Sequence, residues 1–254
     1  MNPFHEANQH RWEAASTGWA AMHERRGTWR NCVQDPTLVF AAEEWDYVAN
    51  SHGKKVAVLG SGDNLAAFAF AGMGAEVTSV DISHNQLAVG IERAAKLGLN
   101  ISFIQADVID LSDLGDRSFD LVYTGGHVAV WVSDLGIYYG EAARILRNNG
   151  LFIINEYHPF RRLWKQGSDR LELAYDYYQR GPFSFAYNDN VLEPQEGTLM
   201  SYEFHWTVSD MINAVLSAGC KIIHTDEFGT HVGDWEGAPL QGLPENLLIV
   251  GRRV

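Results

Sequence analysis

One short part of the sequence constrains the fold more than any other. Residues 56–64 form an apolar run that passes into a glycine-rich turn, Val-Ala-Val-Leu-Gly-Ser-Gly-Asp-Asn, and a second apolar run at 77–80 ends at Asp81. This pattern is typical of a buried strand, a tight turn, a helix and a second strand. Glycine lets the backbone approach a ligand closely, and a helix that begins near Asn64 directs its first N–H groups at the turn. Asp81 stands 21 residues after Gly60, where a carboxylate can accept hydrogen bonds from ribose hydroxyls, so we predict a βαβ unit that holds a nucleoside.

The chain continues this alternation of strands and helices. We predict strands at about 55–59, 76–80, 101–105, 120–124 and 150–156, and helices at 64–73, 84–97 and 133–147. Ser83 and Ser133 are the predicted N-caps of the last two helices. Strands that alternate with helices form a parallel sheet covered on both faces, and the hydrophobic fraction of 46% is enough for a core. We therefore expect one α/β domain over residues 1–254.

The part of the chain before the first strand has a different character. Residues 1–50 are rich in aromatic and polar side chains, and we expect them to form an N-terminal helical cap on the core at 54–156. Asp35, followed by proline, is a typical helix start, and it predicts a helix over 37–49.

A second irregular segment follows the fifth strand. Residues 157–205 carry many aromatic and charged side chains, and a structureless loop of this length is improbable in a compact domain. We predict an inserted lid with short strands there, including one near 199–206. Residues 206–254 return to the core, with a helix at 209–218 and strands near 221–227 and 246–252.

Charge and cysteine content narrow the possible partners. The formal net charge of −13 repels nucleic-acid phosphates, so we expect a small-molecule substrate, no nucleic acid, and a monomer or homodimer. Cys32 and Cys220 fit no metal spacing and indicate reduced thiols. Residues 1–5 lack the features of a signal peptide, and no apolar run reaches 18 residues, so we expect a cytoplasmic protein without a membrane partner.

From about residue 54 to residue 254, the order of these signals resembles that of the class I S-adenosylmethionine-dependent methyltransferases. Similar proteins have a glycine-rich first loop, an acid after the second strand and an acid after the third. This chain has residues 59–64, Asp81 and Asp107 at those places, followed by a strand at 119–124. The resemblance implies a Rossmann-like fold with a seven-stranded, mostly parallel sheet, helices on both faces, and an antiparallel last strand that residues 247–250 can supply.

The resemblance also implies the cofactor, S-adenosyl-L-methionine, and the product S-adenosyl-L-homocysteine. It assigns the ribose to Asp81, the adenine amino group to Asp107, and the methionine moiety to the glycine loop and to residues 124–127. The implied cofactor-binding residues are Gly60, Ser61, Gly62, Asn64, Asp81, Ile82, Asp107, Val108, Thr124, Gly125 and Gly126.

Two departures from the family pattern and one rival cofactor bear on this site. The family often has an acid at the position of Val58 and a glycine at that of Asn64, although Asn tolerates unusual backbone conformations better than most residues. A nicotinamide dinucleotide is the rival, but its fingerprint requires a third glycine where this chain has Leu65.

Methyl transfer is an in-line displacement, and it needs a general base when the acceptor keeps its proton at neutral pH. The candidates are His158, His127 and His205, with His158 first because residues 156–159 gather ionisable and aromatic groups. Each can instead be a partly buried histidine that hydrogen-bonds to the backbone. Their wide separations offer no metal-ligand spacing, so no metal is expected.

Tryptophans are the remaining candidates for the acceptor site. A cage for a flat or cationic acceptor can be built from Trp12, Trp19, Trp29, Trp131, Trp164 and Trp206, although such residues more often serve packing. In similar enzymes the segment before the sheet folds over the cofactor. The expected function is methyl transfer to a small, aromatic or heterocyclic acceptor at oxygen or nitrogen. The alternatives are other alkyl-transfer chemistry with the same cofactor, or a non-catalytic regulatory subunit that binds it.

Overall fold

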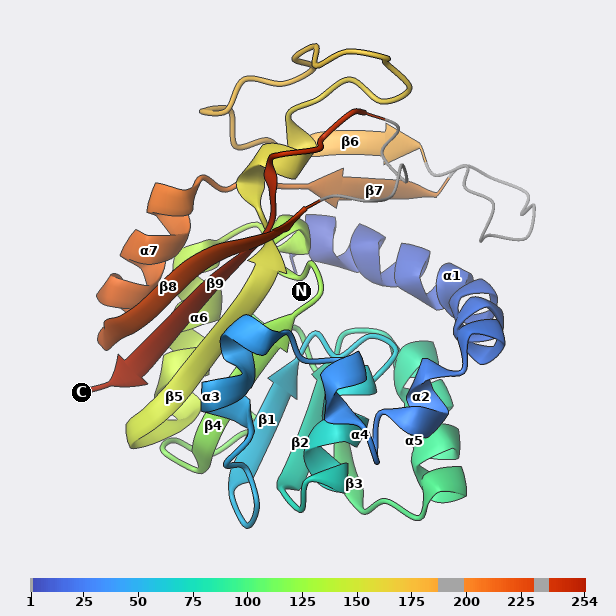
Figure 1. Ribbon diagram of the computed structural model, residues 1–254, viewed down its shortest axis with the longest axis vertical. Coiled ribbons are helices and arrows are strands. Elements are labelled where there is room, and N and C mark those ends of the chain that lie inside the picture. Colours follow the sequence, from blue (N-terminus) through green and yellow to red (C-terminus); the bar gives the residue numbers. More distant parts are fainter. Residues whose placement is uncertain (1, 187–198, 231–237) are drawn as a thin grey trace.

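A computed structural model describes residues 2–186, 199–230 and 238–254 of the chain. Within them, strands and helices alternate as the sequence predicts (Figure 1). The α-helices are α1 Pro3–Arg26, α2 Thr28–Asn31, α3 Trp45–Val48, α4 Leu65–Gly72, α5 His84–Leu97, α6 Leu135–Ile145 and α7 Val208–Ser217, and the short 3-10 helices are η1 Pro36–Leu38, η2 Ala42–Glu44, η3 Ala129–Trp131 and η4 Pro159–Arg162. The strands are β1 Lys55–Leu59, β2 Glu76–Asp81, β3 Ile101–Gln105, β4 Phe119–Gly125, β5 Leu146–Tyr157, β6 Phe183–Ala186, β7 Met200–Glu203, β8 Cys220–Thr230 and β9 Pro244–Arg253.

Seven of these strands form one sheet in the order β3-β2-β1-β4-β5-β9-β8. Strands β1 to β5 pair in parallel, and β9 runs antiparallel between β5 and β8. The expected seven-stranded, mostly parallel sheet is confirmed, and its antiparallel strand β9 contains residues 247–250. The strand order reverses between β1 and β4, and α/β sheets bind their ligands at the carboxyl ends of the strands beside such a reversal.

Apolar side chains pack on both faces of the sheet. On one face Ala57, Leu59 and Val122 share a core with residues of α6 and α7, and on the other face Val56 and Val58 share a core with residues of α4 and α5. Helix α4 is almost entirely apolar because α2 and η1 cover the side that faces away from the sheet. The helices on both faces therefore hold the strand ends in fixed positions.

Of the two predicted N-caps Ser83 and Ser133, the first is confirmed and the second is wrong. Ser83 caps α5, where its hydroxyl accepts a hydrogen bond from the N–H of Gln86 at 3.2 Å. Helix α6 is capped by Asp134 instead of Ser133, through a 3.0 Å hydrogen bond from the N–H of Ile137. An aspartate carboxylate suits a helix N-terminus as well as a serine does, because it also complements the helix dipole.

The single helix predicted over 37–49 is wrong, because this stretch consists of η1, η2 and α3. Asp35 caps η1 as predicted, through a 3.2 Å hydrogen bond from the N–H of Thr37. Beyond it, the ring of Phe40 packs against Phe70 with 4.7 Å between centroids, and Glu44 accepts a 3.0 Å hydrogen bond from Asn155. Both side chains must reach inward to the sheet, and these tertiary contacts override local helix propensity.

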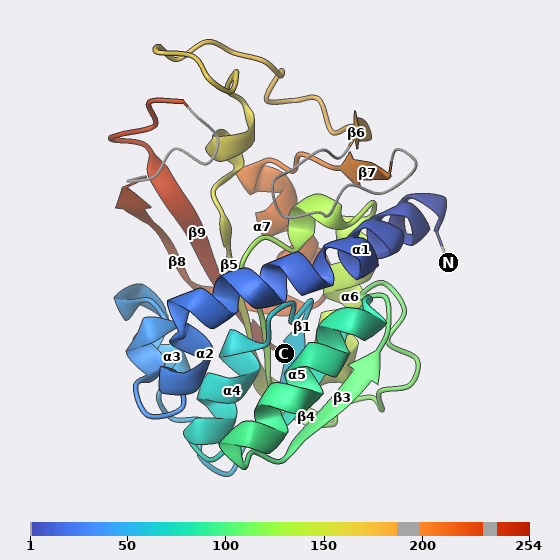
Figure 2. The ribbon, with the colours of Figure 1, turned by 90° about the vertical axis from the view of Figure 1, so that its right-hand side faces the viewer.

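The longest helix, α1, crosses the molecule. Figure 2 shows it running above α4 and α5 and below the β6–β7 pair. Asn8 fixes α1 to β7, because its side chain accepts a 2.8 Å hydrogen bond from the N–H of Tyr202 and donates a 2.9 Å hydrogen bond to the carbonyl of the same residue. Strands β6 and β7 form a separate antiparallel pair within the segment predicted to be an insertion with short strands.

None of the helices within the described ranges combines the length and the apolar composition that crossing a bilayer requires. Cys32 and Cys220 are both buried, free thiols.

Candidate cofactor and acceptor site

The glycine-rich loop lies at the carboxyl end of β1 in strongly constrained backbone conformations. Gly60, Gly62 and Asn64 all have positive φ, of 61°, 49° and 65°. Asn64 thus occupies the left-handed region that glycine usually fills, and its side chain stabilises the turn through a 2.8 Å hydrogen bond to the carbonyl of Gly62. A Cβ atom at Gly62 would meet nothing within 4 Å, so the loop faces open space there, whereas one at Gly60 would lie 2.6 Å from Cγ2 of Val128.

Asp81 at the end of β2 is directly joined to this loop. Its Oδ2 accepts a 2.7 Å hydrogen bond from the N–H of Gly62, and its Oδ1 accepts one of 2.8 Å from the N–H of Ser83. Burial raises the pKa of Asp81 to about 6, although these two backbone N–H groups oppose the shift. The predicted ribose-binding carboxylate therefore sits within hydrogen-bonding distance of the predicted cofactor loop.

Asp107 follows β3, the neighbour of β2, and is held by a residue that the sequence did not single out. Nδ1 of His5 lies 2.7 Å from Oδ2 of Asp107, and Nε2 of His5 accepts a 2.9 Å hydrogen bond from the N–H of Ser133. These two contacts assign the imidazole proton to Nδ1, which donates it to the carboxylate. Val108, also predicted as a cofactor contact, is buried in the core.

Helix α1 makes further contacts with the loops that carry the predicted cofactor residues. Gln9 donates a 2.9 Å hydrogen bond to the carbonyl of Ile82, and the carboxylate of Glu13 accepts from the N–H groups of His84 and Asn85 at 2.6 and 3.0 Å. A further group of α1, Nε2 of His23, lies 3.1 Å from Oδ2 of Asp63 in the glycine loop. One helix thus joins the ends of β1, β2 and β3. These contacts link residues far apart in the chain, and no local sequence pattern signals them.

At the end of β4, the residues predicted to contact the cofactor offer mainly backbone groups to a ligand. The side chain of Thr124 is fully buried and accepts a 2.6 Å hydrogen bond from the hydroxyl of Tyr138. A Cβ atom at Gly125 would lie 2.7 Å from the hydroxyl oxygen of Tyr123, so glycine is required there. Gly126 and His127 have φ values of 79° and 87°, and the chain turns sharply as it leaves the strand.

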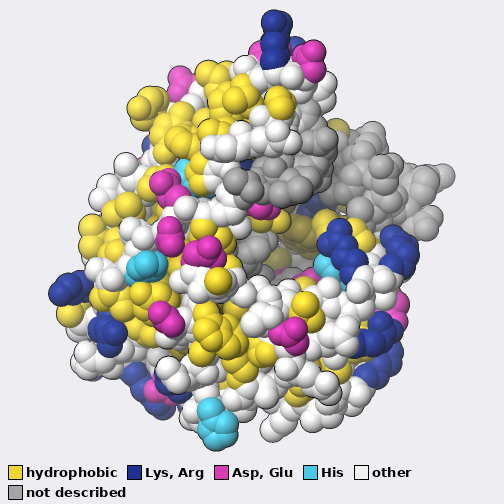
Figure 3. All heavy atoms as spheres, viewed as in Figure 1, with side chains coloured by type: hydrophobic (Ala, Val, Ile, Leu, Met, Phe, Trp, Pro, Cys, Tyr) yellow, Lys and Arg dark blue, Asp and Glu magenta, His cyan; other side chains and the backbone are white. Residues whose placement is uncertain are grey.

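The three candidate histidines come together around one cavity. It encloses about 40 Å³, and its lining includes His127, His158, His205, Glu156 and Arg162. The face of the molecule drawn in Figure 3 has a hollow to the right of its centre. No residue of the glycine loop lines this cavity, so the predicted cofactor loop and the histidine cavity are separate regions.

Two hydrogen bonds join the segment that follows β4 to the segment that follows β7. The N–H of Phe204 donates to the carbonyl of Val130 at 2.7 Å, and the indole N–H of Trp206 donates to the carbonyl of Ala129 at 3.0 Å. His205 lies between these two anchors, and it is thereby brought to the cavity from a different element than His127.

The side-chain contacts of His158 and His127 limit the capacity of each imidazole to act as a general base. Nε2 of His158 lies 2.7 Å from Oε1 of Glu227, and its Nδ1 accepts from the N–H of Phe160 at 3.2 Å, so both ring nitrogens are engaged. Nε2 of His127 contacts the guanidinium of Arg162. Burial, followed by the charges of nearby arginines, holds the pKa of His127 well below its ordinary value.

His205 has a different arrangement. Its Nε2 lies 3.4 Å from Oε2 of Glu203, while its Nδ1 is buried and has no hydrogen-bond partner among the described residues. Burial acts to raise the pKa of Glu203, but the hydrogen bond from His205 and the charge of Arg162 outweigh it, and the net pKa lies below the ordinary value. An ionised Glu203 accepts the Nε2 proton, which leaves the Nδ1 lone pair as the acceptor.

Glu156 at the end of β5 also borders the cavity. Its Oε1 accepts hydrogen bonds from the N–H groups of Val128 and Ala129, both at 3.1 Å. Burial raises the pKa of Glu156 to about 7 despite these contacts. The carboxylate thus fixes the turn that carries His127.

The candidate tryptophans divide between packing and the site. Trp29 is buried in the core beside α4. Trp12 of α1 packs edge-on against Trp131 of η3 with 5.4 Å between ring centroids, and it contacts Trp19 at 6.3 Å. Trp131 in turn lies 6.2 Å from the ring of His127, so part of the aromatic group does adjoin the cavity.

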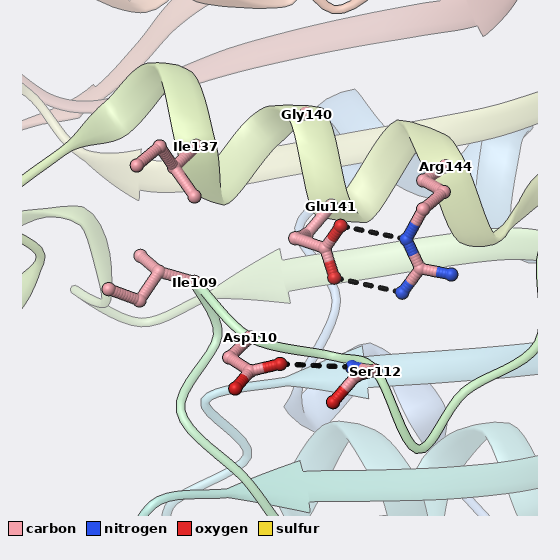
Figure 4. Close-up of a pocket in the computed structure, with 7 residues that line it drawn as sticks. All are labelled: Ile109, Asp110, Ser112, Ile137, Gly140, Glu141 and Arg144. Carbon is pink, nitrogen blue, oxygen red and sulfur yellow. Dashed lines mark hydrogen bonds and ion pairs between the residues drawn. The ribbon is translucent and has the colours of Figure 1, made fainter. Parts of the chain in front are cut away.

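A larger, shallow depression of about 610 Å³ lies elsewhere, between α6 and the loop after Asp107 (Figure 4). Glu141 pairs with Arg144 and accepts a 2.9 Å hydrogen bond from the N–H of Leu111, and Arg144 donates to the carbonyls of Leu111 and Leu114 at 2.8 and 2.9 Å. These groups attach the loop to α6. None of the predicted site residues lines this depression.

This sheet order, with a glycine loop after the first strand and acids after the second and third, defines the Rossmann-like methyltransferase class. Residues 57–154 match the family model of the methyltransferase domain. The chain is similar to the ubiquinone biosynthesis O-methyltransferase of Azorhizobium caulinodans, with 28% identity over 103 residues that make up 41% of this chain and 40% of that protein. It is also similar to the uncharacterized methyltransferase YbaJ of Bacillus subtilis, with 32% identity over 114 residues, 45% of this chain and 44% of the relative. The chain thus aligns with less than half the length of either curated relative.

Among solved structures, an S-adenosylmethionine-dependent methyltransferase from Mesorhizobium loti has the same fold. Its TM-score is 0.63 at 24% identity, over 84% of this chain and 99% of that one. The fold of the chain is therefore that of the class I S-adenosylmethionine-dependent methyltransferases, and residues 57–154 match a methyltransferase domain. The expected fold is confirmed, and the comparisons support the expected superfamily and S-adenosylmethionine as the cofactor of such a domain.

Proposed function

We propose that this protein transfers the methyl group of S-adenosylmethionine to a small, aromatic or heterocyclic acceptor. The observation that carries the proposal is the 2.7 Å hydrogen bond between Asp81 and Gly62, because it joins a buried carboxylate to a glycine loop that faces open space. The cofactor would supply an electrophilic methyl group on a sulfonium.

The residues present fit such a nucleoside. Asp81 would bind the ribose, and Asp107, oriented by His5, would bind the adenine amino group. The backbone from Gly60 to Gly62 and that at 124–126 would border the methionine moiety, and Ser61, Asn64, Ile82 and Val108 would complete the site. Val108 would contribute backbone only, since its side chain belongs to the core. Helix α1 would act as the N-terminal cap, and residues 157–205 as the lid over the acceptor.

We assign the general base to His205 in place of His158. Its Nδ1 is the ring nitrogen that lacks a partner within the described ranges, whereas both nitrogens of His158 are engaged. Nδ1 of His205 would take the proton from an acceptor O–H or N–H group, while Glu203 keeps the Nε2 proton in place. The buried surroundings would exclude water and hold the reacting groups in line.

Oxygen is the acceptor atom that we favour. One relative is named as an O-methyltransferase of ubiquinone biosynthesis, and a hydroxyl keeps its proton at neutral pH, so that a base is useful. We further propose a cytoplasmic monomer or homodimer without nucleic-acid partners, since the net charge is −13 and both thiols are free.

The test is incubation of the protein with methyl-labelled S-adenosylmethionine and a size-fractionated cell extract. We expect label in the small-molecule fraction and S-adenosylhomocysteine in equal amount. Label that appears only in macromolecules would overturn the small acceptor. Cofactor binding without any labelled product would instead favour a non-catalytic regulatory subunit.

A further inference from the structure

Arg162 lines the cavity that holds the candidate histidines, and two further arginines, Arg11 and Arg161, lie near it against Trp131 and Tyr157. Arg11 comes from α1, and Arg161 and Arg162 come from η4. Arg11 is 3% exposed and Arg161 is 4% exposed, and the side chain of Arg162 is 15% exposed. Burial of a guanidinium is costly unless partners compensate it, and each of these three side chains has partners in the structure.

Aromatic rings and carboxylates position these guanidiniums. Cζ of Arg11 lies 4.0 Å from the ring centroid of Trp12 and 4.8 Å from that of Trp131. Cζ of Arg161 lies 3.8 Å over the ring of Tyr157, whose centroid is 4.6 Å from that of His127. Two aromatic rings that adjoin His127, those of Trp131 and Tyr157, thus each contact a guanidinium.

Two ion pairs complete the arrangement. Nη1 of Arg162 lies 3.5 Å from Oε1 of Glu203, and Nη1 of Arg161 lies 3.6 Å from Oε1 of Glu245. A guanidinium presents five N–H donors in a planar fork, so it can hold a ligand carboxylate in addition to the partners it already has. Arg162 lines the cavity and also contacts His127, and so it is the arginine nearest to an acceptor placed there.

We propose that this arginine cluster, Arg11, Arg161 and Arg162, binds a carboxylate carried by the methyl acceptor. The acceptor would then be a small aromatic or heterocyclic acid whose carboxylate faces Arg162 and whose hydroxyl or amine faces His205. This inference rests on the proposed function, since it names the substrate class of the same site. The low pKa of His127, caused by burial and by the charges of Arg162 and Arg161, agrees with a strongly positive environment.

The acceptor is a better source of the carboxylate than the methionine end of the cofactor. The cavity is lined from the segment after β4, from β5, η4, the segment after β7 and α7, and by no residue of the glycine loop. Between the two regions lies Val128, whose side chain packs on Gly60. Arg162, which lines the cavity, therefore lies on the far side of that turn from the predicted cofactor loop.

The first test compares acetate with acetamide, which have nearly the same shape and differ in charge. Each is titrated into the full-length protein saturated with S-adenosylhomocysteine, at constant ionic strength, while the ring signals of His127 and His205 are followed by NMR. We expect acetate to bind at least about tenfold more tightly than acetamide. Equal affinities, or an acetate response confined to other signals, would overturn the proposal without any variant having to fold.

The second test uses Arg162→Gln with Arg147→Gln as the matched control, since Arg147 is exposed and pairs with Asp120 at the amino end of β4. We expect Arg162→Gln to weaken acetate binding about tenfold and the control to leave it unchanged. Affinities for S-adenosylhomocysteine and 5′-methylthioadenosine, which lacks the carboxylate, are measured on the same variants. A loss confined to S-adenosylhomocysteine would assign the cluster to the cofactor and overturn the acceptor assignment. If the wild-type protein binds neither nucleoside, the proposed function itself fails.

Discussion

Nδ1 of His5, in the first turns of α1, lies 2.7 Å from Oδ2 of Asp107 at the end of β3, although 102 residues separate the two in the sequence. The N–H of Ser133 holds the other ring nitrogen, so the imidazole is fixed between two loops of the sheet. The N-terminal helix and the predicted adenine-binding carboxylate are therefore one structural unit.

This unit predicts energetic coupling between His5 and Asp107. In a double-mutant cycle of His5→Ala and Asp107→Ala, measured by urea unfolding, we expect an interaction free energy of about 1–2 kcal/mol, because both side chains are buried. The exposed pair Lys96 and Glu92 serves as the control, and the effects of its two substitutions are expected to be additive. Additive effects at His5 and Asp107 would show that the contact contributes nothing to stability.

Asp81 is predicted to be the main ribose contact. Asp81→Asn should weaken binding of both S-adenosylhomocysteine and 5′-methylthioadenosine about tenfold or more, since both contain the ribose and a hydrogen bond to a charged group contributes about 1.5–3 kcal/mol. Isothermal titration calorimetry measures both affinities. Asp113→Asn, a change at an exposed position, is the control. Unchanged affinity in Asp81→Asn would remove the ribose assignment.

Stability should depend on pH through Glu44. Burial raises the pKa of this carboxyl from 4.5 to about 7, so the folded state binds its proton more tightly than the unfolded state does. Stability then falls as pH rises between those two values, by about 3 kcal/mol in total.

Glu44→Gln should remove this contribution and raise the free energy of unfolding above pH 7 relative to the wild type. Urea unfolding across the pH range measures it. Glu76→Gln, at a side chain that is 70% exposed, should leave the pH slope unchanged. A wild-type slope retained in Glu44→Gln would contradict the assignment.

The assignment of the base to His205 makes a kinetic prediction. His205→Gln should lower kcat about 10²–10⁴-fold with an oxygen acceptor, because proton removal would be lost, whereas His158→Gln should have a much smaller effect. Glu203→Gln should shift the pH profile of kcat, a readout that a merely structural role would not move. The reverse order of the two histidine variants would restore His158 as the base.

Substitutions at Asn64 test the backbone conformation of the glycine-rich loop. With φ at 65°, Asn64→Ala should destabilise the protein more than Asn64→Gly does, by about 1 kcal/mol, because alanine tolerates the left-handed region poorly. Thermal unfolding of the two variants decides. Both variants lose the same side-chain hydrogen bonds, so equal stabilities would contradict the penalty that the left-handed backbone conformation predicts.

The parallel core could be predicted from sequence because its signals are local. The alternation of apolar runs with amphipathic segments places β1 to β5 within a few residues, and Ser83 and Asp81 follow from position alone. The convergence of His127 and His158 follows from the same rule, since they come after β4 and β5 of the sheet. His205 follows β7 of the separate pair, and long-range hydrogen bonds from Phe204 and Trp206 bring it to the cavity.

The path of the N-terminal segment could not be predicted, because its determinants are long-range. His5, Gln9 and Glu13 contact backbone and side chains more than 70 residues away, and α1 carries no continuous apolar face to announce them. The same reason applies to the pairing of Glu203 with Arg162, which lies far from it in the sequence, whereas its partner His205 is only two residues away.

The most direct measurement is calorimetric titration of the folded protein with S-adenosylhomocysteine and, separately, with NAD. We expect saturable binding of one S-adenosylhomocysteine per chain and no heat with NAD, because Leu65 stands where a dinucleotide fingerprint requires glycine. Heat with NAD alone, or none with either S-adenosylmethionine or S-adenosylhomocysteine, would contradict the account.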